Sequence, residues 1–309
     1  MHHKPLYLFF FLMSSSLCYG QALNQLSNSK DDSPIIIEAD KSVVCDETLN
    51  KCVATGNAMA QKSTNIVYAD ILTVYFSEGK EREITSIVAD GHVRMETPTD
   101  TAYGDHAHYD VALDRILMTG GNLRIETPQQ TLTARDSIEY WHSKNQGIAR
   151  GNAIAQFPEK EELVQADTLI AYFKPATEKT DEGKEKLTID RVEAEGNVLA
   201  SGPKGIVTGD RGVYFAQTHL VEISHNVKIT QDKNVITGEY VRHNLDTNVT
   251  EMYTQAPGVA SSGSVKRISG LISPKDAKKM KGKPSETTQK SKDGHLFPVS
   301  AKNKKTSTS

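Results

Sequence analysis

The chain has 309 residues, and its 36 basic and 39 acidic side chains give a net charge of −3 at pH 7. This balance provides no overall basic surface for nucleic acid, and we predict no nucleic-acid partner. The charges are unevenly distributed, because residues 264–309 are strongly basic and the preceding part of the chain is acidic.

Residues 1–22 have the pattern of a secretory signal peptide. A short basic start precedes the apolar stretch Leu6–Met13, which has the length of a signal-peptide core and is too short to span a bilayer. The small residues Gly20 and Ala22 offer cleavage points for signal peptidase. Cys18 argues weakly for a lipoprotein, since lipid attachment requires a small residue before the cysteine and a leucine stands there. We therefore expect an exported, soluble mature protein.

Cys45 and Cys52 are the two cysteines beyond the signal. An exported pair is expected to form a disulfide. The polar residues between them predict a turn that joins two β-runs, which would place the sulfur atoms across a hairpin. Because the closed loop is short, we expect a contribution of about 2 kcal/mol. The alternatives are two free thiols or, less favoured without a second ligand pair nearby, a metal site.

An internal repeat covers residues 34–255. One signature, Gly followed by Asn or His and then an apolar residue, recurs roughly every 30 residues. Its copies begin at Gly56, Gly91, Gly121, Gly151 and Gly196, with a degenerate copy at His225. A second signature keeps step with the first and ends at Asp40, Asp70, Asp105, Asp136, Asp167 and Asp210. Units of this length bury a shared core by stacking on their neighbours.

The residues after each copy alternate between apolar and polar, which is the period of a strand with one buried face. The apolar positions are Val93, Met95, Leu123, Ile125, Val198, Ala200, Val227 and Ile229. Intervening residues such as Arg94 and Glu126 belong to the solvent-exposed face. The glycine of each signature fits a bulge or a tight bend where a strand turns a corner. We predict an all-β fold of about 12–16 strands.

Motifs of catalysis are absent from the sequence. No nucleophile elbow, zinc-protease motif or phosphate-binding loop occurs. The repeated aspartates, one per unit at a constant place, indicate a turn or strand-start role. His106 and His108 share a strand face beside Asp105 and could hold a metal, although two histidines on a surface strand is the more ordinary explanation. We predict no enzyme activity, no catalytic residue, no metal site and no cofactor.

Two segments fall outside the repeat. A charged insertion at residues 175–186 accounts for the one long interval between copies. Residues 260–309 are rich in Lys, Ser and Thr and cannot bury enough apolar surface to fold alone, so we predict a disordered basic tail. The tail either solubilises the protein or attracts the anionic phosphates of lipid or lipopolysaccharide.

The repeat resembles the OstA-like family of lipopolysaccharide transport proteins, of the LptA type. That family repeats an alanine-aspartate, a turn, an apolar strand and Gly-Asn-Val, and TLNKCVATGNAMAQ and RVEAEGNVLASG look like typical copies. The resemblance implies an open, twisted β-jelly-roll of antiparallel strands in the periplasm, whose interior holds the acyl chains of lipopolysaccharide. It also implies a bridge between an inner-membrane complex and the outer-membrane assembly machinery. The insertion, the cysteine pair and the tail depart from the family's pattern.

Under this resemblance the eight apolar residues named above would line a lipid-binding groove, with each buried methylene contributing about 0.8 kcal/mol. One alternative is a closed core without a groove, because any β-roll needs inward-facing valine and isoleucine. Another is a repetitive β-solenoid envelope protein, either an adhesin or a glycan-active enzyme. The single Trp141 and the dispersed aromatic residues give that reading little support.

An open roll leaves an unpaired edge strand at each end, near residues 34–44 and 249–253. The resemblance implies that the first edge pairs with the inner-membrane component and the second with the outer-membrane component. Because the two edges are unlike, they also allow a head-to-tail homo-oligomer that does not close into a ring.

Overall fold

The computed structural model of the chain describes residues 34–79, 82–179, 185–256 and 267–272. These residues form one antiparallel sheet of eighteen strands with two short 3₁₀ helices, η1 (His142–Lys144) and η2 (Pro158–Lys160). The strands are β1 (Ile35–Glu38), β2 (Ser42–Asp46), β3 (Lys51–Lys62), β4 (Asn65–Phe76), β5 (Ile84–Glu96), β6 (Thr101–Asp110), β7 (Arg115–Thr119), β8 (Arg124–Glu126), β9 (Thr131–Thr133), β10 (Ser137–Trp141), β11 (Gln146–Phe157), β12 (Glu162–Lys179), β13 (Glu185–Gly202), β14 (Gly205–Phe215), β15 (Leu220–Gln231), β16 (Asn234–Asn244), β17 (Val249–Tyr253) and β18 (Ser269–Leu271). The predicted signal peptide lies outside the described residues.

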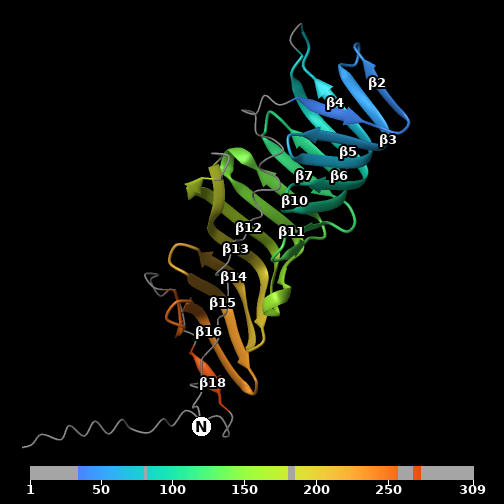
Figure 1. Ribbon diagram of the computed structural model, residues 1–309. Coiled ribbons are helices and arrows are strands. Elements are labelled where there is room, and N and C mark those ends of the chain that lie inside the picture. The colour runs from blue at the N-terminus through green and yellow to red at the C-terminus, as the bar shows by residue number, and fades with distance from the viewer. Residues whose placement is uncertain (1–33, 80–81, 180–184, 257–266, 273–309) are drawn as a thin grey trace, which may run out of the picture.

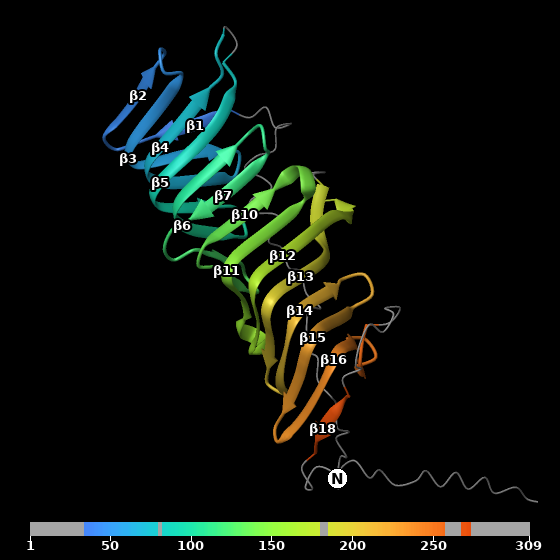
Figure 2. The ribbon, with the colours of Figure 1, turned by 180° about the vertical axis from the view of Figure 1, so that it is seen from behind.

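The strands stack along one long, twisted axis, with β1 and β2 at one end and β17 and β18 at the other (Figures 1 and 2). Four pairs of short strands each lie beside one long partner: β1 and β2 beside β3, β7 and β8 beside β6, β9 and β10 beside β11, and β17 and β18 beside β16. When each pair is counted as one course, fourteen courses cross the sheet. The sequence predicts about 12–16 strands, and the structure has eighteen because four courses are each broken into two short strands.

The long strands bend at the repeated Gly-Asn signature, as predicted. The register shifts by an extra residue between Thr55 and Ala58, Asp90 and Val93, Arg150 and Ala153, Glu195 and Val198, and Ser224 and Val227. At the second corner Gly91 has φ +78° and His92 has φ +46°. Glycine reaches positive φ without strain, and Asn and His are the residue types that next tolerate it. At the third copy the course breaks between β7 and β8, and Gly120 and Asn122 take the positive φ values.

The repeated aspartates lie at these corners. The predicted strand-start role is wrong for Asp70, Asp105, Asp167 and Asp210, which lie inside β4, β6, β12 and β14. Their carboxylates accept hydrogen bonds from the corner residue of a neighbouring strand. The bonds to asparagine are Asn57 Nδ2 to Asp40 Oδ2 (2.7 Å), Asn197 Nδ2 to Asp167 Oδ2 (2.8 Å) and Asn226 Nδ2 to Asp210 Oδ2 (2.8 Å). These bonds hold the bends, where the ladder of backbone hydrogen bonds is interrupted. Asp136 differs, because its carboxylate accepts from the guanidinium of the adjacent Arg135 (2.7 and 3.0 Å).

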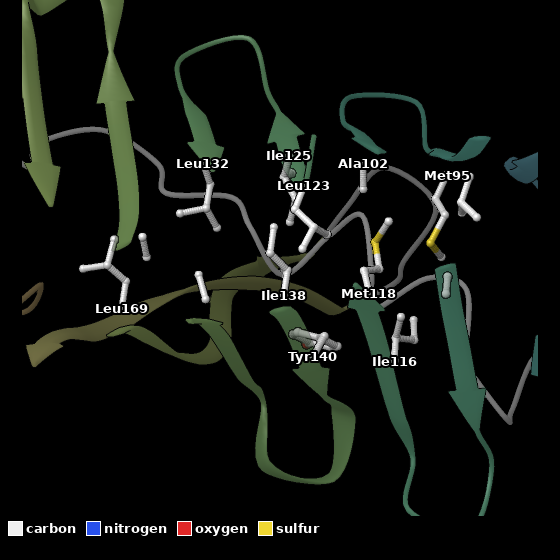
Figure 3. Packing of buried hydrophobic residues seen from close by; sticks show 14 of the residues in the cluster. Met95, Ala102, Ile116, Met118, Leu123, Ile125, Leu132, Ile138, Tyr140 and Leu169 are labelled. Carbon is white, nitrogen blue, oxygen red and sulfur yellow. The ribbon is translucent and has the colours of Figure 1, made fainter. Parts of the chain in front are cut away.

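The bends divide the roll into two facing layers. The first layer carries the hairpin turns at residues 63–64, 97–100, 127–130, 158–161, 203–204 and 232–233, and we call this edge the first lip. Figure 3 shows side chains from both layers meeting in the interior. Met95, Ile125 and Leu132 come from the first layer, and they face Met118 and Ile138 of the second.

The two segments outside the repeat take different forms. The insertion at 175–186 lengthens the hairpin of β12 and β13, which pair Pro175 with Leu187 and Lys179 with Glu185. Within the predicted tail, residues 269–271 form β18 and pair with residues 235–237 of β16, so order extends further than predicted. The rest of the tail, residues 260–266 and 273–309, lies outside the described part of the chain.

Candidate functional site

The interior of the roll is packed in some places and open in others. Buried apolar side chains form two separate clusters. The larger cluster reaches from β3 to β13 and includes Leu72, Ile116 and Met118, each at most 1% exposed. The smaller cluster lies near the C-terminal end and consists of Val207, Ile223, Val227, Ile229 and Val241, with Val221 and Met252 packed against it.

An apolar groove opens between the two layers where the clusters meet. Its empty volume, including solvent at its mouth, is about 1270 Å³. Strands β8 to β15 line it, and many of the lining residues are small: Gly147, Ala149, Ala155, Ala171, Ala194, Ala200, Gly202, Gly205 and Gly212. Larger apolar residues such as Leu169, Val198 and Ile223 complete the walls. Facing layers with alanine and glycine cannot fill the space that leucine, isoleucine and methionine fill elsewhere in the roll.

The eight residues predicted to line a groove all point toward the interior, but the structure does not bring them together. Ile125, Val198 and Ala200 line the groove; Val93, Met95 and Leu123 are buried in the larger cluster; Val227 and Ile229 are buried in the smaller one. The predicted groove and its alternative, a closed core, therefore both occur, in different sections of one roll.

Sequence reasoning missed the wall that the second layer supplies. Ala149, Ala171, Ala194 and Gly212 belong to that layer, on the far side of each corner from the residues that were singled out. Side-chain size along one strand would not have located the groove, because β3 carries Ala54, Ala58 and Ala60 at the inward positions where β11 carries Ala149, Ala153 and Ala155. The prediction considered only whether inward residues were apolar and not how large they were.

The polar groups of the groove wall are few and mostly neutralised. Glu139 accepts hydrogen bonds from Arg150 Nε (3.1 Å) and from Trp141 Nε1 (3.1 Å). Burial raises the pKa of the Tyr140 hydroxyl, so this group stays protonated at neutral pH. The Tyr140 ring packs edge-on against His142, with centroids 4.5 Å apart, and tilted against Phe173 at 6.2 Å. The groove is therefore suited to an apolar ligand.

The outer face of the roll carries the charged residues that the alternation predicted. Arg94 lies over the ring of Tyr68 (4.3 Å to the centroid), and Arg124 lies over Tyr103 (3.7 Å). Each arginine also pairs with the glutamate two residues later on its strand, at 2.7 Å in both cases. These residues stabilise the solvent-exposed surface of the sheet and do not contribute to the groove.

The histidines that could hold a metal are engaged by other partners. His106 Nδ1 lies 2.6 Å from Oδ1 of Asp90, its cross-strand neighbour, and His108 Nε2 lies 2.9 Å from Ser86 Oγ. In the described ranges no group of three or more His, Cys, Asp or Glu side chains is arranged to hold a metal ion. No helix in those ranges is long and apolar enough to cross a membrane.

Cys45 and Cys52 stand directly opposite each other on β2 and β3. Their Sγ atoms are 2.01 Å apart, which is a bonded distance. The bond therefore joins the strands at the N-terminal edge of the roll, across the hairpin at which the sequence places it.

The architecture is that of an open antiparallel β-jelly-roll with an apolar groove. The sequence model of the LptA/(LptD N-terminal domain) LPS transport protein family matches residues 36–146 and 135–249. These matches cover more than half of the chain, and the chain belongs to this family. The predicted resemblance to the OstA-like, LptA-type proteins is confirmed.

One solved structure similar to this chain is that of LptH, described as the LptA homologous periplasmic component of the conserved lipopolysaccharide transport device from Pseudomonas aeruginosa. The two sequences are 14% identical over 80% of this chain and 99% of that chain, with a TM-score of 0.21. Comparison with curated protein sequences returns no match.

Proposed function

We propose that the protein is a periplasmic lipopolysaccharide-binding bridge, which carries lipopolysaccharide from the inner to the outer membrane for outer-membrane assembly. The observation that supports this most directly is an apolar groove in a chain whose family transports lipopolysaccharide. Burial of acyl chains against alanine, valine and leucine would contribute about 0.8 kcal/mol per methylene. The sugar and phosphate groups would remain in water at the groove mouth.

A binding role fits the chemistry of the groove better than an enzymatic one. A hydrolase needs a nucleophile beside a base, or paired carboxylates around the scissile bond. Glu139 is the acidic residue of the groove lining, and Arg150 and Trp141 occupy both of its oxygens. We therefore propose no catalytic residue and no cofactor for this site.

Bridging would use the two ends of the roll. In the described part of the chain, β1 and β2 pair on one side with β3, and β17 and β18 pair on one side with β16. Both edges carry exposed apolar side chains: Ile36 (50%) and Val44 (59%) at one end, Val249 (52%) and Leu271 (67%) at the other. We propose that the first edge pairs with the inner-membrane component and the second with the outer-membrane component. The same edges support head-to-tail homo-oligomers.

Photo-crosslinking tests lipid binding at the groove. A photoreactive residue at Ile125 or Ala200 should capture lipopolysaccharide, because both side chains line the groove. The matched controls are Glu126 and Glu195, which lie on the same strands but belong to the outer face. Equal capture at the inner and outer positions would contradict the groove as the lipid site.

Depletion of the protein in its own bacterium tests transport. If the protein is a bridge, newly made lipopolysaccharide should accumulate at the inner membrane once the protein is gone. Normal arrival of lipopolysaccharide at the outer membrane would contradict the bridging role while leaving lipid binding intact.

A further inference from the structure

A row of buried polar side chains closes the first lip. At five of its six hairpin turns, the first inward-facing residue after the turn is polar. These residues are Asn65, Asp100, Gln130, Glu162 and Asn234, with exposed fractions of 3%, 2%, 2%, 3% and 6%. The next inward residue of the same strand is apolar in these repeats, for example Val67, Ala102 and Leu132. The polar row therefore lies between the apolar interior and the solvent at the edge.

The row is interrupted at the hairpin of β13 and β14. The last pair of this hairpin is Gly202 and Gly205, which stand opposite each other. The position of Gly205 is held by Asn65 in the β3–β4 hairpin, opposite Lys62, and by Asn234 in the β15–β16 hairpin, opposite Gln231. Gly202 and Gly205 both belong to the groove lining. Hence, along the first lip as the structure describes it, the polar side chain is missing where the groove reaches the edge.

The turn at this gap carries a positive charge. Lys204 is exposed and also lines the groove. On the far side of Gly202 lies Glu162, since a Cβ added to Gly202 would be 3.2 Å from Glu162 Cγ. Burial raises the pKa of Glu162 to about 7, and the charges of Lys160 and Lys204 oppose that shift. Lys160 and Lys204 are thus close enough to act on this carboxyl, and two basic side chains beside one acidic side chain favour an anion at the gap.

Strand packing explains part of this arrangement but not all of it. A Cβ on Gly205 would lie 2.6 Å from the backbone oxygen of Thr230, so close approach of β15 requires glycine there. No backbone atom imposes the same restriction on Gly202, whose nearest contacts are side-chain atoms of Glu162. Packing also does not account for a lysine in the turn that faces the groove.

We propose that the Gly202–Gly205 hairpin is the place where an anionic lipid enters the groove, with the Lys204 ammonium binding the phosphate of the headgroup while an acyl chain passes over the two glycines. This inference rests on the proposed function, because it requires acyl chains in the groove. The occupant is a phosphate-bearing amphiphile, and free phosphate alone has no apolar part to hold it in the groove.

Binding of two amphiphiles with the same acyl chain tests the entry site in the full-length protein. Dodecyl phosphate and dodecyl maltoside, each below its critical micelle concentration, differ only in the headgroup. Wild-type protein should bind dodecyl phosphate about tenfold more tightly, the effect of one charge-assisted hydrogen bond. Lys204→Glu should abolish this preference, measured as the ratio of the two affinities in the same variant. Millimolar inorganic phosphate should not displace dodecyl phosphate.

The matched control is Lys233→Glu. Lys233 is exposed and occupies the equivalent turn position beside Asn234, where the polar row is intact. It should retain the full preference for dodecyl phosphate. Equal losses in the two variants would overturn the proposal in favour of general electrostatic attraction, and so would a Lys204→Glu variant that binds like the wild type. Displacement by inorganic phosphate would overturn it in favour of a simple anion site.

Groove-filling variants separate failure of the entry site from failure of the proposed function. Ala194→Phe and Ala200→Phe place a ring in the groove and should lose both amphiphiles at least tenfold, with folding checked by circular dichroism. If a folded variant still binds both amphiphiles like the wild type, the groove is not the lipid site and both proposals fall. If these variants lose binding but Lys204→Glu does not alter the phosphate preference, the entry proposal alone falls.

Discussion

Two sections of the roll share one repeat and one backbone pattern, yet one is a packed core and the other an open groove. In the section from β3 to β7, Leu72, Met95 and Met118 belong to the buried cluster and fill the space between the layers. In the section from β11 to β15, alanine and glycine occupy many of the corresponding inward positions. The repeat sets the course of the strands, and side-chain volume decides whether the space between the layers is filled.

This division separates stability from binding. Large inward residues in the packed section remove most apolar surface from water and leave no room for a ligand. Small residues in the groove section give up part of that burial. A roll of stacked units can combine both, because each unit depends mainly on its neighbours.

Shortening equivalent leucines should show the largest difference in stability between the sections. Leu72 and Leu169 both lie two residues after the corner aspartate, and their exposed fractions are 0% and 7%. Leu72→Ala should lower the free energy of unfolding by about 4 kcal/mol, because it leaves a closed cavity. Leu169→Ala, in the groove wall, should cost about 2 kcal/mol, because little new cavity forms there. Urea denaturation measures both, and equal losses would break the comparison.

Enlarging buried alanines should give opposite outcomes in the two sections. Ala107 (6% exposed) lies in the packed section and Ala194 (5% exposed) lines the groove. Ala107→Phe should lower the free energy of unfolding by about 2–3 kcal/mol through overpacking and leave lipopolysaccharide binding nearly unchanged in the folded fraction. Ala194→Phe should change stability by less than about 1 kcal/mol and abolish binding. Denaturation and a lipopolysaccharide binding assay on the same samples check both. Destabilisation of similar size in both variants would show that the groove is not open space.

Removing the disulfide should affect the N-terminal edge alone. Cys45→Ser should lower stability by about 2 kcal/mol, since the bond closes only a short hairpin, and it should not alter lipopolysaccharide binding. Cys45 lies on β2, which pairs with β3 and is remote in strand order from the groove at β8 to β15. Melting temperature and binding affinity of the variant test this. Quantitative alkylation of both thiols in protein taken directly from the periplasm would refute the bond itself.

The fold could be predicted because its determinants are local. Alternation of apolar and polar residues marks the strands, and the Gly-Asn signature supplies the positive φ values of the corners. The role of the aspartates could not be predicted in this way, because the partners of Asp167 and Asp40 lie 30 and 17 residues away in sequence. Strand β18 is short, is separated from β16 by a long segment, and has no alternating pattern to reveal it.

The location of the groove depends on residues that are far apart in the chain. Ile125 and Ile223 line the same space although nearly a hundred residues separate them. Whether Val198 contacts a neighbour or faces empty space depends on the volume of side chains on other strands. A pattern read along one strand identifies the inward face but cannot supply that volume, which is why three of the eight predicted residues line the groove and the other five do not.

The smallest predicted effect concerns the polar row that closes the first lip. Burial raises the pKa of Glu162 from its ordinary value to about 7, with Lys160 and Lys204 opposing the shift. A carboxyl with a raised folded-state pKa destabilises the fold when it ionises. The penalty is absent below the unfolded-state pKa of about 4.3, grows as the pH rises from there through 7, and is constant above.

Glu162→Gln should therefore match the wild type in stability at pH 4 and exceed it by roughly 1 kcal/mol at pH 8, with the nearby lysines limiting the gain. The control is Glu159→Gln, an exposed glutamate in η2 close to the same lip, which should not produce a difference that grows with pH. Denaturation of the three proteins at both pH values measures this. A Glu162→Gln advantage that does not change with pH would mean that the carboxyl ionises without cost. In that case water would reach the polar row, the edge would be open along its whole length, and the gap at Gly202–Gly205 would lose its distinction from the other hairpins.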